Sequence, residues 1–227
     1  MADKPARQVL PGDAIVITSA PAYVGRGGDK LARALDVFSI DPAGCECLDV
    51  GSSTGGFTDC LLQAGAARVV ALDVGTAQLH ERLRADERVD VWEQTDIRSV
   101  TPEQLGGPFD IVVCDVSFIG LDRILDVLLA QIHSFGVLVV LVKPQFEAGK
   151  QEASKGRGVI TDPTIWERVL HEVIDAVAGR GATVADATVS PIKGGSGNVE
   201  FLLMVRGWSD DCTIDVEALI ADAQDLH

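Results

Sequence analysis

Short apolar runs alternate with amphipathic stretches along most of this chain of 227 residues. Runs of strand length predict strands at 45–50, 68–73, 89–92, 109–115, 136–142, 182–189 and 199–205. Apolar residues at helical spacing predict helices at 29–38, 56–64, 76–84, 121–132 and 163–178, and a further short strand is expected at 14–17. Strands that alternate with helices are typical of βαβ units, so we expect an α/β fold with a mostly parallel sheet.

A glycine-rich turn follows the first strand of this alternating region. It contains Gly51, Ser52, Gly55, Gly56 and Phe57. Glycines at such a turn let backbone N–H groups come close to a ligand. The spacing G-x-x-x-G-G lacks the second glycine of the dinucleotide fingerprint G-x-G-x-x-G. The turn therefore indicates a nucleotide-type cofactor without a pyrophosphate, although a tight strand-to-helix connection would look the same.

Acidic residues follow the next two strands. Asp73 lies 22 residues beyond Gly51, where a carboxylate can accept hydrogen bonds from both hydroxyls of a ribose, and Val74 comes next to it. Asp96 could accept the amino group of an adenine while Ile97 packs against the ring, but a helix N-cap explains Asp96 equally well. NAD and S-adenosylmethionine both need the ribose carboxylate. The loop spacing favours S-adenosylmethionine, which has no pyrophosphate.

Charged residues also mark the later strands. Asp115 and Lys143 end two of them, and Pro144 fixes the point where Lys143 emerges. Ligands of open α/β sheets gather at the carboxyl edge, so both side chains should face the cofactor. Glu200 lies between apolar neighbours at the start of the last strand. A solvated strand end would explain Lys143, and an outward-facing position would explain Glu200, without any chemistry.

Composition limits the class of protein. With 47% hydrophobic and 23% charged residues, the chain can form one sizeable core and needs no second one. It has neither a membrane-spanning apolar run nor a signal-peptide pattern, so we expect a cytoplasmic protein with no membrane partner. Five cysteines without a C-x-x-C pair are typical of a reducing compartment, and we expect no metal site.

The net charge of −15 argues against a nucleic-acid partner, because phosphate binding relies on Lys and Arg. Six acidic residues lie after position 208, in a segment without Lys or Arg, so the rest of the chain carries −9. Basic residues occur where a substrate would arrive, namely Arg26, Lys150, Lys155, Arg157 and Lys193. They could form a basic rim that holds a few phosphates, or a solvated loop.

Five longer phrases of sequence resemble a known family. They are Y-V-G-R-G-G-D-K-L at 23–31, L-D-V-G-S-S-T-G-G-F-T-D-C-L-L at 48–62, D-V-S-F-I at 115–119, V-K-P-Q-F-E at 142–147 and G-N-V-E-F at 197–201. Over residues 10–207 the chain is similar to the hemolysin A (TlyA-type) branch of the FtsJ-like RNA methyltransferases. The resemblance implies a Rossmann-like class I methyltransferase with a seven-stranded, mostly parallel sheet and helices on both faces. It also implies S-adenosylmethionine as cofactor and 2′-O-methylation of ribosomal RNA, with ribosomal RNA or ribosomal subunits as partner.

The resemblance further implies a Lys-Asp-Lys-Glu tetrad, which here falls on Lys30, Asp115, Lys143 and Glu200. A ribose 2′-hydroxyl is a poor nucleophile until its proton is withdrawn, and a lysine can withdraw it only as the neutral amine. An ordinary lysine pKa of about 10.4 must fall for this, which burial and a second nearby ammonium group favour. A nearby carboxylate raises the pKa of a lysine instead of lowering it, so we expect Asp115 and Glu200 to orient the two amines.

Two features depart from the family pattern. Its members carry a small N-terminal RNA-binding domain of the kind found in ribosomal protein S-four, of which we expect only a remnant here, and Gly25 stands where the family usually has Ser. We divide the chain into an N-terminal lead at 1–22, a methyltransferase domain at 23–207 and an acidic C-terminal tail at 208–227. A small-molecule O-methyltransferase is the alternative function. A membrane-active or non-catalytic binding role is a third, but no basic amphipathic helix supports it.

Overall fold

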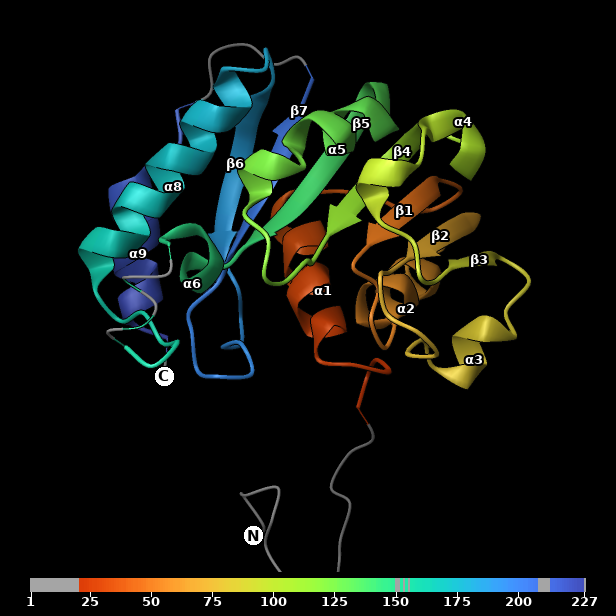
Figure 1. The fold of residues 1–227 in the computed structure, drawn as a ribbon, viewed down its shortest axis with the longest axis horizontal. Coiled ribbons are helices and arrows are strands. Elements are labelled where there is room, and N and C mark those ends of the chain that lie inside the picture. Colours follow the sequence, from red (N-terminus) through yellow and green to blue (C-terminus); the bar gives the residue numbers. More distant parts are fainter. Residues whose placement is uncertain (1–20, 150–151, 153, 155, 208–212, 227) are drawn as a thin grey trace, which may run out of the picture.

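A seven-stranded sheet runs through the molecule, with helices packed against both of its faces (Figure 1). The computed structural model describes residues 21–149, 152, 154, 156–207 and 213–226, so the strand expected at 14–17 lies outside the described residues. In spatial order the strands are β3 (Val89–Trp92), β2 (Arg68–Leu72), β1 (Glu46–Val50), β4 (Phe109–Cys114), β5 (Ile132–Val142), β7 (Phe201–Arg206) and β6 (Thr183–Val189). β7 runs antiparallel to the other six strands, which all run in the same direction. The predicted seven-stranded, mostly parallel sheet is confirmed.

The helices form two layers, one on each face of the sheet. One layer contains α1 (Gly27–Val37), α2 (Gly56–Gln63) and α3 (Glu81–Arg84). The other contains α4 (Pro102–Leu105), α5 (Leu125–Gln131), α8 (Pro163–Ala178) and α9 (Val216–Gln224). Along β4, Val112 faces the second layer and Val113 faces the first, and both are fully buried. Burial on both faces explains why the central strands are continuous apolar runs rather than alternating ones.

The strand order places the cofactor end of the sheet between β1 and β4. The chain moves outward from β1 to β2 and β3 and then returns to β4 on the other side of β1. Ligands of open α/β sheets bind where the strand order reverses in this way. Gly51 follows β1 with φ +85°, and a Cβ atom there would lie 2.6 Å from the carbonyl oxygen of Asp115, which follows β4. Only glycine fits that position, so the turn after β1 can lie directly against the end of β4.

The region between β4 and β5 differs from the prediction. A single helix was expected at 121–132 and a strand at 136–142. The structure instead has a 3₁₀ turn at Leu121–Arg123, a short α5, and a β5 that begins at Ile132. Ile132 pairs with Phe109, and the register then shifts before Ile111 pairs with Val137. Strand pairing with β4 therefore overrides the helical pattern in the residues before 136.

The acidic C-terminal segment contains a helix that was not predicted. Three apolar residues of α9, Val216, Leu219 and Ala223, are buried, and the helix packs against α8 and β6. Their spacing is helical, so the pattern was present in the sequence but was hidden by the acidic residues between them. The carboxylate of Asp215 caps the helix by accepting the backbone N–H of Ala218 at 2.9 Å. Residues 213–226 are therefore part of the folded core.

Replacing Leu219 by Ala should destabilise the protein by about 2–4 kcal/mol, because a buried leucine side chain is lost and a cavity is left. Urea denaturation followed by circular dichroism measures this. The matched control is Glu217→Ala, on the exposed side of the same helix, which should change the free energy of unfolding by less than about 0.5 kcal/mol. Equal effects of the two substitutions would contradict the packing of α9 against α8.

Candidate active site

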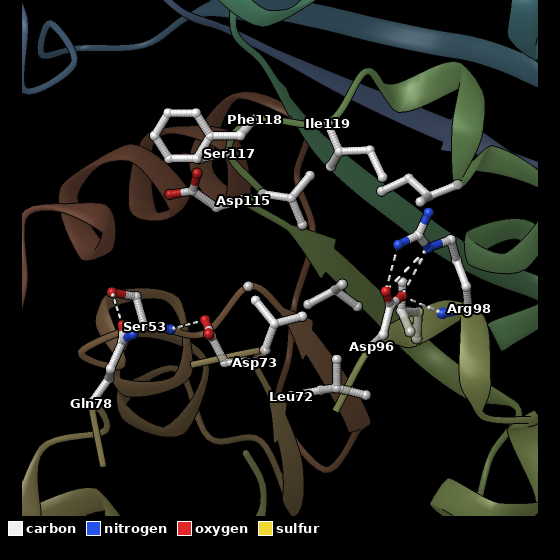
Figure 2. Close-up of a pocket in the computed structure, with 16 residues that line it drawn as sticks. Ser53, Leu72, Asp73, Gln78, Asp96, Arg98, Asp115, Ser117, Phe118 and Ile119 are labelled. Carbon is white, nitrogen blue, oxygen red and sulfur yellow. Dashed lines mark hydrogen bonds and ion pairs between the residues drawn. The ribbon is translucent and has the colours of Figure 1, made fainter. Parts of the chain in front are cut away.

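A cavity of about 440 Å³ opens at the carboxyl ends of β1, β2 and β4. Six of the ten residues predicted to bind the cofactor line it, namely Gly51, Asp73, Val74, Asp96, Ile97 and Asp115. Figure 2 shows Asp115 and Phe118 on one side of this cavity, Ser53 and Asp73 on the opposite side, and Asp96 with Arg98 at one end. Its size lies in the range of small-molecule sites. The structure therefore brings the ends of three strands together around one ligand-sized space.

The Asp73 carboxylate joins the glycine-rich turn to the second strand. Its two oxygens accept the backbone N–H of Ser53 at 2.8 Å and of Gly75 at 2.6 Å. A carboxylate has about four lone-pair positions, so two remain for a ligand. The backbone contacts hold the carboxylate in place before a ligand arrives. This geometry suits the recognition of a vicinal diol such as a ribose.

Asp96 is both a cap and a cavity residue. Its carboxylate caps the 3₁₀ turn at Ile97–Ser99 by accepting the backbone N–H of Arg98 at 2.9 Å. It also forms a two-pronged ion pair with the guanidinium of Arg98, which holds the pKa of Asp96 below its usual range. The N-cap interpretation of Asp96 is therefore confirmed, and the contact with adenine stays a prediction for a residue that lines the cavity. Arg98 itself lines the cavity and was not predicted, because an arginine two residues beyond a carboxylate is common on any surface.

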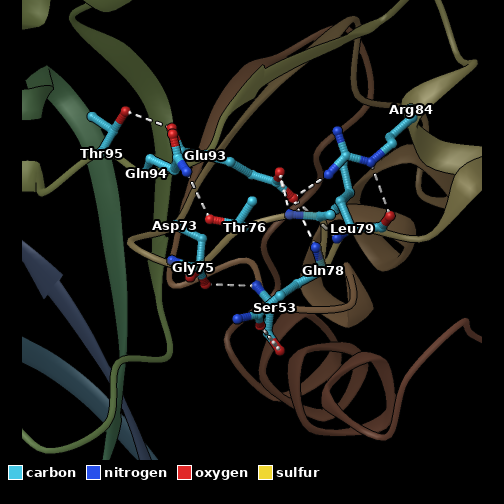
Figure 3. Close-up of polar contacts among 11 residues, drawn as sticks. Ser53, Asp73, Gly75, Thr76, Gln78, Leu79, Arg84, Glu93, Gln94 and Thr95 are labelled. Atoms are coloured by element: carbon cyan, nitrogen blue, oxygen red, sulfur yellow. Dashed lines mark hydrogen bonds and ion pairs between the residues drawn. The ribbon is translucent and has the colours of Figure 1, made fainter.

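The loop between β2 and α3 is held by one carboxylate. Glu93, just after β3, accepts the backbone N–H groups of Ala77, Gln78 and Leu79 and pairs with the guanidinium of Arg84 (Figure 3). The hydrogen bond from Arg84 is the main cause that lowers the pKa of Glu93 to about 2. Because these amides donate to Glu93, the helix predicted at 76–84 forms only from Glu81. The loop is thereby fixed with Gln78 at the cavity, where Ser53 donates to its side-chain oxygen at 3.3 Å.

Asp49 is a further carboxylate near the cavity, and the sequence analysis missed it. It lies inside β1, fully buried, and accepts the hydroxyl of Thr58 at 2.6 Å. Its other oxygen has no hydrogen-bond partner within the described residues. Burial is the main cause that raises the pKa of Asp49 to about 7, and the nearby Asp115 and Asp73 contribute to that rise. The signal was a single acidic residue in an otherwise apolar strand, which is rare without a function.

Two buried ion pairs hold the four residues of the predicted tetrad. Lys30 Nζ of α1 lies 2.5 Å from Glu200 Oε2, and Lys143 Nζ lies 2.5 Å from Asp115 Oδ1. Lys143 also donates to the hydroxyl of Ser117 at 3.0 Å. Both lysines and Glu200 are less than 10% exposed. Buried charges are stable only when paired, so the pairs fix both amines at the carboxyl edge of the sheet.

The sheet register accounts for the position of Glu200. Val142 of β5 pairs with Phe201 of β7, so the residues just beyond them, Lys143 and Glu200, lie next to each other at the same edge. Asp115 ends the neighbouring β4. Lys30 comes from α1, and it lines a smaller cavity together with Asp115. The structure therefore brings all four predicted residues to one place.

The remaining predicted cofactor residues divide between two environments. Ser52, Gly56 and Phe57 line the smaller cavity, of about 210 Å³, with Arg26 and Lys30. Gly55 lines neither cavity. It precedes α2 with φ +97°, and a Cβ atom there would meet the Leu83 side chain at 2.2 Å. Gly55 therefore allows the turn to pack against α3.

Part of the predicted basic rim is brought together by a buried asparagine. The side chain of Asn198 accepts the backbone N–H of Ile160 and donates to the carbonyl of Gly158, both at 2.8 Å. It thereby joins the segment that carries Arg157 to the turn that carries Lys193. Arg26 reaches toward the same turn, since its Nη2 lies 3.5 Å from where a Cβ atom of Gly195 would be. Lys150 and Lys155 lie outside the described residues.

An exposed aromatic ring lies beside the tetrad. Phe118 is 90% exposed, has φ +67°, and packs its ring against Phe146 with a centroid distance of 4.9 Å. Lys143 Nζ lies 5.9 Å from the centre of the Phe146 ring. Glu147 joins the same two segments, since its carboxylate accepts the backbone N–H of Leu121 at 3.1 Å. The loop after β4 and the short helix α6 (Pro144–Glu147) after β5 are therefore tied together around Lys143.

The buried Glu147 should make stability depend on pH. Burial is the main cause that raises the pKa of Glu147 to about 7, so the folded protein keeps this proton between about pH 4.5 and 7 while the unfolded chain loses it. The free energy of unfolding then falls as pH rises through that window. Glu147→Gln, which keeps an acceptor for Leu121, should reduce the fall by on the order of 1–3 kcal/mol.

Urea denaturation at pH 5 and pH 8 tests this expectation. Asp49 titrates in the same window in both proteins, so the difference between them isolates Glu147. Glu81→Gln, at an exposed position of α3 in the other helical layer, is the matched control and should leave the pH dependence unchanged. Parallel stability curves for the Glu147→Gln and wild-type proteins would show that Glu147 is ionised in the folded state at pH 5.

Comparison with known proteins places this architecture in a family. The sequence model of the FtsJ-like methyltransferase family matches residues 23–206. The 16S/23S rRNA (cytidine-2′-O)-methyltransferase TlyA of Mycobacterium tuberculosis is 45% identical over 209 residues, which cover 91% of this chain and 78% of that protein. Hemolysin A of Brachyspira hyodysenteriae is 39% identical over 198 residues, or 87% of this chain and 82% of that protein.

A solved structure shows the same fold. The crystal structure of a protein described as a hemolysin, from Lactococcus lactis, superposes with a TM-score of 0.84 at 42% identity, and the match covers 89% of this chain and 99% of that one. In the described part of this chain, no helix combines the length and the apolar character needed to cross a bilayer. The family match spans all seven strands and all four residues of the tetrad. The chain belongs to the FtsJ-like methyltransferase family.

Proposed function

We propose that this protein uses S-adenosylmethionine to methylate the 2′-hydroxyl of a ribose in ribosomal RNA. The observation that carries the proposal is the pair of buried ion pairs, Lys30–Glu200 and Lys143–Asp115, at the edge of a cavity suited to adenosine. The named activity of the relative from Mycobacterium tuberculosis, a ribosomal RNA cytidine-2′-O-methyltransferase, supports the choice of acceptor.

The residues of the larger cavity fit the cofactor. Asp73 has lone pairs free for a ribose diol, while Asp96 and the buried Ile97 offer an acceptor and an apolar surface for adenine. Three carboxylates, those of Asp73, Asp96 and Asp115, line the cavity, and a ligand that carries a positive charge suits this lining. When bound, S-adenosylmethionine supplies a methyl group that is already activated by the positive charge on its sulfur. The protein's main task is then to orient and deprotonate the acceptor.

Lys143 acts as the general base toward the acceptor hydroxyl. Its ammonium group first gives a proton to solvent, the neutral amine then takes the hydroxyl proton, and Asp115, 2.5 Å away, stabilises the ammonium group that forms again. The hydroxyl of Ser117 fixes the direction of the amine. Lys30, held by Glu200, supplies a second positive group near the oxygen as its negative charge develops.

The exposed ring of Phe118 supports an acceptor that carries a base. An apolar side chain that is 90% exposed beside a polar site has no role in the core of the fold. Aromatic rings are the usual stacking surfaces for unpaired bases in RNA recognition. Phe118 is adjacent in sequence to Ser117, whose hydroxyl contacts the proposed base, so a stacked nucleoside would bring its ribose close to Lys143.

Replacing Lys143 by Arg should reduce methyl transfer at least about 100-fold and leave the affinity for S-adenosylmethionine nearly unchanged. Arginine can still pair with Asp115 but cannot give up its proton in a protein, so the ion pair is kept while the base is lost. Single-turnover rates and calorimetric titration separate the two effects. Lys193→Arg is the control and should transfer methyl groups at the normal rate. Normal turnover in Lys143→Arg would remove Lys143 from the role of base.

The acceptor is identified by labelling. The protein is incubated with tritiated S-adenosylmethionine and either ribosomal subunits or a small-molecule metabolite extract, at two salt concentrations. We expect label in RNA, resistant to alkaline cleavage at the modified ribose, and a modest fall in rate with salt because few phosphates are held. Label found only in small molecules would exclude RNA as the substrate and leave an O-methyltransferase of another class. Absence of label in both fractions, with no binding of the cofactor, would reject methyl transfer itself.

A further inference from the structure

Two glycine-rich turns touch each other through their backbones at the smaller cavity. A Cβ atom on Gly56 would lie 2.9 Å from the amide nitrogen of Gly28 and 3.1 Å from the carbonyl oxygen of Gly25. A Cβ atom on Gly25 would lie 2.7 Å from the hydroxyl of Thr54. No larger side chains fit between the turns, so the residue within the first turn, Arg26, is held directly beside the cofactor loop.

The position of this first turn is fixed from both sides. The carboxylate of Asp59, buried on α2, accepts the backbone N–H of Val24 at 2.8 Å. Gly28, in the first turn of α1, donates its backbone N–H to the carbonyl of Gly25 at 3.0 Å. Arg26 is therefore carried by a rigid turn, and only its own side chain is free to adjust.

The smaller cavity adjoins the larger cavity proposed for adenosine. Gly51, Ser53 and Asp115 line both of them. In the proposed complex the adenosine of the cofactor lies against Asp73 and Ile97. The other end of the cofactor then extends past Gly51 and enters the smaller cavity. The smaller cavity is lined mainly by polar groups, whereas the larger one has an apolar floor. A charged, hydrogen-bonding end of the ligand suits it better than an aromatic ring does.

Arg26 is an unpaired positive charge in this cavity. The other cation there, Lys30, is already paired with Glu200 at 2.5 Å. Arg26 makes no hydrogen bond or ion pair with any residue in the described parts of the chain. Seven of the eleven other arginines of these parts are paired with carboxylates, including Arg82 with Asp59 and Arg98 with Asp96. A guanidinium left unpaired at the end of a ligand cavity indicates an anionic group on the ligand.

We infer that Arg26 binds the carboxylate at the amino-acid end of the cofactor, an inference that rests on the proposed function. The adenosine end lies in the larger cavity, and the methionine end reaches the smaller one. Its carboxylate meets the fork of Arg26, while the carboxylate of Asp115, which lines both cavities, lies near the path of the positive sulfur and ammonium groups. Arg26 is thus a cofactor-binding residue and not the RNA-phosphate contact that its place in the sequence suggested.

The test compares two ligands that differ only in this carboxylate, S-adenosylmethionine and its decarboxylated form. Calorimetric titration measures the Kd of each ligand for the wild-type protein and for Arg26→Ala, Arg26→Lys and Arg33→Ala. In Arg26→Ala the Kd for S-adenosylmethionine should rise about 10-fold or more, while the Kd for the decarboxylated form should stay within about twofold. Arg26→Lys should recover part of the loss, and Arg33→Ala, at an exposed position of α1 outside both cavities, should change neither value.

Each other outcome is decisive. Loss of affinity for both ligands in Arg26→Ala would mean that the turn, and not a carboxylate contact, was disturbed, and would overturn the inference. Unchanged affinity for both, together with a raised KM for RNA, would make Arg26 a phosphate contact and would also overturn it. If the wild-type protein binds neither ligand, the proposed function fails first, and this result is distinct from the failure of Arg26 alone.

Discussion

Two ammonium groups buried at the carboxyl edge of the sheet impose the strongest constraint on this structure. An unpaired buried charge is destabilised by several kcal/mol relative to water, so Lys30 and Lys143 each require a carboxylate in contact. Lys143 and Asp115 join the ends of β5 and β4, and Lys30 and Glu200 join α1 to the strand that runs antiparallel to β5. Four distant parts of the chain are thereby fixed at one point. Hydrophobic residues could stabilise the same fold, so the pairs indicate that the amines are kept for chemistry.

The position of these charged residues at the carboxyl edge of the sheet also determines the electrostatics of the site. Burial is the main cause that raises the pKa of Asp49 to about 7, and the carboxylates of Asp115 and Asp73 contribute to that rise. Asp115 has Lys143 as its counterion, whereas Asp73 accepts two backbone N–H groups. The cavity therefore presents one carboxylate with a counterion and one held only by neutral donors, and a ligand with positive charge suits the second.

The sequence predicted more of the sheet than of its connections. The central strands are short apolar runs, and such runs predict strands without information from distant residues. The helix predicted at 163–178 has the same bounds as α8, because Asp162 and Pro163 mark its start. The helix expected at 76–84 forms only from Glu81, because the carboxylate of Glu93, just after β3, accepts the backbone N–H groups of residues 77–79. Ile132 was assigned to a helix because nothing local indicates its pairing with Phe109.

The candidate site shows the same division. The tetrad could be located because its four residues lie within the sequence phrases that resemble the family. A parallel sheet also brings the carboxyl ends of its strands to one edge, where Asp115 and Lys143 lie. Pairing within it could not be predicted: Glu200 neighbours Lys143 in the sheet but its carboxylate contacts Lys30. Asp49, Arg98 and Phe118 were missed because burial, pairing and exposure of a side chain depend on tertiary packing. Phe118 in particular is distinguished only by its exposure, which no sequence pattern reveals.

Net charge alone overstates the obstacle to binding RNA. The acidic helix α9 packs against α8 and β6, and β6 is the edge strand, three strand spacings from β4. Asn198 joins the segment that carries Arg157 to the turn that carries Lys193, so two of the predicted basic residues lie on segments that are tied to each other. The distribution of charge, and not its sum, decides whether a phosphate can be held near the site.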